Sequence, residues 1–95
     1  MNSAIVTAIR EVRWRQSVCV EGVVETMRIR PTGHEAAILE CILDDGEARL
    51  PVIFFGYRKI GGLTLGRRIR VEGMVIEWEH RLAILNPFYT LLSPR

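Results

Sequence analysis

The stretch VCVEGVV at residues 18–24 recurs as IRVEGMV at residues 69–75, 51 positions later. Each copy opens with an alternating lead-in that is typical of a β-strand with one buried face. Each copy also carries a glycine near its middle, Gly22 or Gly73. Glycine weakens a flat strand, but it permits a bulge or a sharp coil where a sheet curls. The pair therefore predicts two long strands that form matching corners of a closed barrel.

Turn residues divide the rest of the chain into further strands. Asp44-Asp45-Gly46 has the composition of a tight hairpin turn, because Asp and Gly tolerate positive φ angles, and Glu79-His80 is expected to form another tight turn. Pro51 implies an edge or bulged position in its strand. The glycine-rich segment 56–66 is expected to be a connector with at most one helical turn. The predicted strands are residues 17–29, 35–43, 48–55, 68–78 and 81–85, followed by an extended segment at 89–92.

The length of 95 residues favours a single domain. Ile5, Ile9 and Val12 have helical spacing, so we expect residues 1–13 to form an N-terminal extension or a short helical turn across one end of the barrel. The barrel itself is expected to span residues 14–92.

The composition excludes several classes of protein. The chain is 48% hydrophobic and 25% charged, which is an ordinary globular balance and not that of a disordered chain. Thirteen basic and eleven acidic residues leave a net charge of +2, which excludes a strongly basic chromatin-type binder. Twelve of the basic residues are Arg, which binds phosphate and stacks on rings better than Lys does, although a high-GC bacterial genome would also enrich Arg.

Chemically reactive residues form no recognisable site. Cys19 and Cys41 are too few for a disulfide scaffold or a C-x-x-C metal site, and His34 and His80 fall in different predicted turns. We therefore expect no enzyme activity, no metal and no cofactor. The first residues lack a basic region before a long apolar run, and no window approaches the roughly 18 apolar residues of a membrane span, so we expect a cytoplasmic protein that has no membrane partner.

Alternation along the predicted strands separates two faces. One face is wholly apolar, with Leu39, Cys41 and Leu43 on it in the second strand, and must form the core. The opposite face is richer in apolar side chains than a solvated surface should be. Nucleic-acid bases, a partner subunit (most simply in a two-fold homodimer) or another domain should cover it. The apolar residues of this outer face are Ile42, Ile53, Phe55, Met74, Ile76 and Leu85.

The order and spacing of these segments resemble the OB-fold, the five-stranded Greek-key barrel that binds oligonucleotides and oligosaccharides. The chain is similar over about residues 7–92 to the nucleic-acid-binding OB family that includes the wedge domain of the RecG branch-migration helicase, and to small stand-alone OB-fold proteins of high-GC bacteria. The family pattern G-x-x-[VI]-x-V-x-G is intact from Gly66 to Gly73, and an apolar pair followed by N/H-P-x-[YF] is intact at Leu85 to Tyr89. Asp44-Asp45-Gly46-Glu47 departs from the family's usual Asp-x-Thr-Gly and adds negative charge beside the usual binding face.

The resemblance implies an all-β, five-stranded OB-fold barrel with a short connector in place of a long helix between strands three and four. It also implies a module that binds single-stranded or junction DNA or RNA with little sequence preference; the alternative is a protein–protein interaction or homodimerisation module that binds no nucleic acid. In such folds basic side chains track the backbone, and each aromatic ring that stacks a base contributes about 1–3 kcal/mol. The residues in the matching places, on the face of strands two and three and its flanking loops, are Arg28, Arg30, Phe55, Tyr57, Arg58, Trp78, His80 and Arg81.

Overall fold

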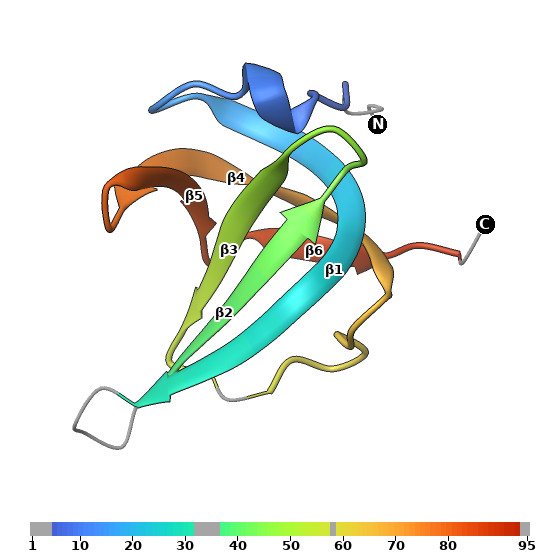
Figure 1. Cartoon of the computed structure of the whole chain (residues 1–95), viewed down its shortest axis with the longest axis vertical. Coiled ribbons are helices and arrows are strands. Elements are labelled where there is room, and N and C mark those ends of the chain that lie inside the picture. The colour runs from blue at the N-terminus through green and yellow to red at the C-terminus, as the bar shows by residue number, and fades with distance from the viewer. Residues whose placement is uncertain (1–4, 32–36, 58, 94–95) are drawn as a thin grey trace.

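This computed structural model describes residues 5–31, 37–57 and 59–93, which contain six β-strands and one short 3-10 helix (Figure 1). The predicted connector contains turns and no helix over its described residues, 56–57 and 59–67. No helix in the described part of the chain has the length and apolar character that a membrane crossing requires. The elements are η1 (Ile9–Glu11), β1 (Ser17–Pro31), β2 (Ala37–Asp44), β3 (Arg49–Phe55), β4 (Arg68–Trp78), β5 (Arg81–Leu85) and β6 (Phe88–Leu91).

The strands pair in the order β1-β2-β3-β5-β4-β6, and an additional pairing of β1 with β4 closes a ring of five strands (Figure 1). The pairing of β3 with β5 is parallel, and the other pairings between named strands are antiparallel. The short β6 pairs with β4 over four residues and extends the ring. This is the all-β, five-stranded architecture that the sequence predicts, with the segment after the fifth strand forming a sixth.

The two similar stretches lie side by side in the ring. They pair antiparallel, with Val20 opposite Val71 and Gly22 opposite Ile69. Around Val23, β1 passes from β4 to β2, and after Met74 β4 passes from β1 to β5. Each glycine of the repeated motif therefore lies next to the point where its strand changes partner, as predicted for strands that curl into a ring.

The inner face of the ring forms the main core, as alternation predicts. Leu39, Cys41 and Leu43 of β2 are buried there with the matching residues of β3. The pairing of β3 with β5 begins at Val52, so Pro51 lies where β3 has an edge on that side. Proline has no N–H to donate, so this edge position accommodates it.

The outer face carries a second, smaller core. Ile38, Ile53 and Ala83 are buried on it, and Trp78 packs against them. Ile53 lies on the outer face as predicted, but its relative exposure is 0% within the single chain, so the expectation that another molecule or domain must cover it is wrong. The physical reason is that β2, β3 and β5 bring their outward apolar side chains together, and the indole at the end of β4 packs against this cluster.

The N-terminal turn is fastened to the β2–β3 hairpin. Ile9 is buried in the main core, and its backbone N–H donates to the Asp45 carboxylate at 2.9 Å. The same carboxylate accepts hydrogen bonds from the backbone N–H groups of Glu47 and Ala48, each at 3.0 Å. Burial acts to raise the pKa of Asp45, but these backbone donors outweigh it and hold the pKa below its ordinary value of 3.8. The acidic hairpin is thus a structural clamp across one end of the ring.

Candidate functional site

Three arginines and two glutamates form an ion-paired cluster on the outer surface, which we call the arginine face. Arg28 and Arg30 come from the last part of β1, and Arg81 is the first residue of β5. Glu40 lies between them on β2, opposite Arg28 in the β1–β2 pairing, and Glu79 lies in the turn between β4 and β5. The structure therefore brings together three of the residues that the sequence places in the candidate site.

Glu40 is the centre of the arginine face. Its side chain is only 4% exposed, and its Oε1 lies 2.7 Å from Arg28 Nη2 and 3.5 Å from Arg30 Nη1. Its Oε2 lies 3.3 Å from Arg81 Nη2. A buried carboxylate is stable only when it is paired, and three neighbouring guanidiniums repel one another unless an anion lies between them. Glu40 thus holds in one place three side chains that would otherwise spread apart.

Sequence reasoning missed the role of Glu40. The signal that could have found it is a single acid inside the apolar run AILECIL at residues 37–43. Acidic residues are almost never fully buried unless they are paired. An acid in a buried strand therefore predicts basic partners on the neighbouring strands.

Glu79 closes the other side of the arginine face. Arg30 donates two hydrogen bonds to it, from Nη1 at 3.1 Å and from Nη2 at 2.6 Å. The hydrogen bond from Arg30 lowers the pKa of the Glu79 carboxyl, and the charges of Arg28 and Arg81 act in the same direction. This ion pair ties the end of β1 to the β4–β5 turn.

Two of the three guanidiniums remain accessible to solvent. The side chains of Arg28 and Arg81 are 65% and 52% exposed, and three guanidiniums against two carboxylates leave one net positive charge. A shallow concavity of about 440 Å³ lies beside them, lined also by Thr26, Glu40 and Ile42. Exposed guanidinium N–H groups in a fixed arrangement are suited to a planar or tetrahedral anion such as phosphate.

Exposed aromatic rings lie next to the arginine face. Ile38 of β2 is opposite Arg30 on one side and opposite Phe55 of β3 on the other, so one row of side chains crosses the outer surface. Phe55 and Tyr57 are 47% and 53% exposed. They line a cavity of about 520 Å³ together with Asn86, whose Oδ1 accepts a hydrogen bond of 2.8 Å from the Phe55 backbone N–H. Phe55 therefore lies on the same surface as Arg30, two strands away from it.

The remaining predicted site residues differ in their positions. Trp78 is partly buried because it covers the outer apolar cluster, which gives it a structural role. His80 is exposed in the β4–β5 turn beside Glu79. Arg58 lies outside the described residues, as does the predicted turn that holds His34.

The outer apolar residues do not form one open surface. Phe55, Met74 and Leu85 are exposed, whereas Ile42 and Ile76 are half-buried and Ile53 is fully buried. Met74 pairs with Ser17 of β1, on the β1–β4 side of the ring, whereas Leu85 pairs with Ile53 on the β3–β5 side. These six residues are therefore spread around the ring, and one of them, Ile53, is covered by the chain itself.

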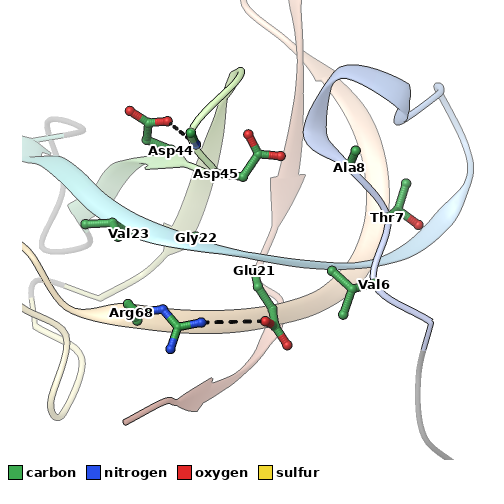
Figure 2. Close-up of a pocket in the computed structure, with 10 residues that line it drawn as sticks. Val6, Thr7, Ala8, Glu21, Gly22, Val23, Asp44, Asp45 and Arg68 are labelled. Carbon is green, nitrogen blue, oxygen red and sulfur yellow. Dashed lines mark hydrogen bonds and ion pairs between the residues drawn. The ribbon is translucent and has the colours of Figure 1, made fainter. Parts of the chain in front are cut away.

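Another cavity, of about 550 Å³, lies between the N-terminal segment and the β2–β3 hairpin (Figure 2). Its acidic side chains already have partners. Glu21 pairs with Arg68 at 3.9 Å and with Arg70 at 2.6 Å, and Asp44 accepts a hydrogen bond of 2.7 Å from the backbone N–H of Gly46. Among the described residues no group of three His, Cys, Asp or Glu side chains is arranged to hold a metal ion.

Comparison with known proteins identifies the fold. A family model described as "OB-fold nucleic acid binding domain" matches residues 18–92. Among solved structures, the chain is similar to one described as "Structure of RecG bound to three-way DNA junction", with a TM-score of 0.78 and 18% sequence identity. The similarity covers 90% of this chain but only 12% of the RecG chain. A search of the curated proteins finds no match.

Proposed function

We propose that this chain, which belongs to the family of OB-fold nucleic acid binding domains, binds single-stranded or junction nucleic acid across the arginine face. The exposed guanidiniums of Arg28 and Arg81 contact backbone phosphates in this proposal, and the rings of Phe55 and Tyr57 stack bases. Phosphate contacts and stacking both act on every nucleotide, so little sequence preference follows.

One observation carries the proposal. A buried carboxylate, Glu40, gathers three guanidiniums onto the outer surface beside exposed aromatic rings. A solvated surface needs no such arrangement, because exposed ion pairs contribute little to stability. The homodimer alternative has less support, because Ile53, one of the residues predicted for its interface, is buried within one chain.

Fluorescence anisotropy with a labelled oligothymidylate of about 16 nucleotides, the upper end of the site size of one OB-fold, tests the proposal. Each phosphate contact on a single strand contributes about 0.7 to the slope of log affinity against log salt, so two contacts predict a roughly 7-fold loss of affinity between about 50 and 200 mM salt. Arg28→Ala with Arg81→Ala removes most of this salt dependence. In that variant Arg30 still pairs with Glu40.

A matched control separates the site from the total charge. Arg10→Ala with Arg49→Ala also removes two exposed arginines, each paired with a surface glutamate, and is expected to bind as the wild type does. Absence of binding at low salt, or equal binding by the two double variants, would overturn the proposal. A three-way DNA junction and an RNA strand of equal length serve as further probes, because the RecG structure holds such a junction.

A further inference from the structure

The β4–β5 turn holds Glu79 in an unfavourable backbone conformation. Glu79 and His80 have φ angles of 53° and 70°, so both residues of the turn are left-handed. Hairpin turns of this kind favour Asn-Gly, because side chains beyond Asn, Asp and Gly rarely adopt positive φ. Strain of this kind at a candidate site is a reason to look for a function of the strained residue.

The Glu79 carboxylate occupies the position on Arg30 that a phosphate would take. The two guanidinium nitrogens lie 3.1 and 2.6 Å from the two carboxylate oxygens, a fork-to-fork arrangement. Arginine binds phosphate in the same bidentate way. The Arg30 donors most suited to a phosphate are therefore already used by this chain.

The two acids of the arginine face differ in their freedom to move. Glu40 lies on a strand, beneath the guanidiniums, with a side chain that is 4% exposed, so it cannot leave without disrupting the surface. Glu79 lies on a two-residue turn, and its side chain is about half exposed. Glu79 can therefore exchange its hydrogen bonds with Arg30 for hydrogen bonds with water.

We propose that Glu79 is an acidic latch that occupies Arg30 in the free protein and competes with nucleic-acid phosphate for it. This inference rests on the proposed function and adds a way in which the chain itself regulates nucleic-acid binding. The latch limits the free protein to two available arginines and lowers its affinity for phosphate-rich ligands. Removing the negative charge of Glu79 makes Arg30 the third phosphate contact.

Glu79→Gln tests the latch, because Gln keeps the size of Glu and loses only the charge. The labelled oligothymidylate is titrated between about 50 and 200 mM salt. Two phosphate contacts predict a roughly 7-fold loss of affinity for the wild type over this range, and three contacts predict a roughly 18-fold loss for Glu79→Gln. The variant also binds several-fold more tightly at the lower salt concentration.

Two further variants exclude a simple effect of net charge. Glu47→Gln removes an exposed glutamate that pairs with Arg10 at the far hairpin, and its salt dependence should equal that of the wild type. The double variant Arg30→Gln with Glu79→Gln has the wild-type net charge but lacks the released arginine. Its salt dependence should return to about 7-fold.

The outcomes distinguish the latch from the proposed function. If the wild type binds and Glu79→Gln binds equally or more weakly, the latch is overturned and the proposed function stands. Tighter binding by Glu79→Gln than by the wild type, with the steeper salt dependence, supports the latch. If neither protein binds at any salt concentration, while their circular dichroism spectra show both folded, the proposed function and the latch are overturned together.

Discussion

Replacing Gly22 with Ala should destabilise the ring much more than the same change at Gly73, although the two glycines occupy equivalent places in the repeated motif. A Cβ atom on Gly22 would lie 2.7 Å from the Asp44 carbonyl oxygen and 3.0 Å from the Asp44 carbonyl carbon. A Cβ atom on Gly73 would meet the Ile84 Cγ2 methyl at 2.9 Å, and its next nearest neighbours, two atoms of Pro87, would lie at 3.5 Å. A backbone carbonyl in a paired strand cannot move aside, whereas the Ile84 methyl, although buried, can shift slightly with its side chain.

The expected magnitudes follow from two opposing effects. Overpacking costs about 1–3 kcal/mol, and the smaller entropy of the unfolded Ala chain offsets about 0.4–1 kcal/mol of this. Gly22→Ala falls at the upper end and should lose about 2 kcal/mol, whereas Gly73→Ala should lose close to zero. For a chain of this size, about 2 kcal/mol lowers Tm by roughly 8–16 °C.

Urea and thermal unfolding followed by circular dichroism measure both variants against Gly61→Ala. A Cβ atom on Gly61 would meet nothing within 4 Å, so this control should be at least as stable as the wild type. If Gly22→Ala proves no less stable than Gly73→Ala, then β1 does not approach the β2–β3 hairpin as closely as described, and the reasoning about the change of partner strand fails.

Three further predictions concern the clamp, the outer cluster and the thiols. Asp45→Asn should lower the free energy of unfolding near pH 7 by about 1–2 kcal/mol. Because folding lowers the pKa of Asp45, its stabilisation is present above about pH 4 and is lost on further acidification. Urea unfolding at several pH values should therefore show a weaker acid dependence of stability in the variant, and an equal dependence in both proteins would contradict the clamp. Ile53→Ala should cost about 2–4 kcal/mol in urea unfolding and Met74→Ala less than about 0.5 kcal/mol; equal effects would show that Ile53 is not buried within the single chain. Cys41, whose pKa burial raises to about 11, should react with a thiol reagent at pH 8 only after unfolding, and rapid labelling of Cys41 itself, as distinct from Cys19, in the native protein would contradict this core.

Local patterns predict most of the fold. The strand at 68–78 and the turn at Glu79-His80 are confirmed at their predicted bounds, because alternation and turn residues act over a few neighbouring positions. The repeated motif also predicts the ring, since each glycine lies where its strand changes partner.

The features that the sequence did not predict depend on contacts between distant residues. The Asp45 carboxylate binds the backbone of Ile9, 36 residues away, and no local pattern encodes that contact. The burial of Ile53 depends on Ile38 and Ala83, which the pairings of β3 with β2 and β5 bring to it from distant parts of the chain. The arginine face is an intermediate case: its arginines were predicted as individual residues, but Glu40 and Glu79 connect them only in three dimensions.

Chemical-shift mapping tests the central claim, binding at the arginine face, most directly. Amide nitrogen–proton spectra of the labelled protein are recorded while oligothymidylate is added at low salt. The claim predicts shifts at Arg28, Glu40, Phe55 and Arg81, all on the outer surface of β1, β2, β3 and β5. Shifts confined to the β1–β4–β6 side, around Phe88, or no shifts at all, would contradict it.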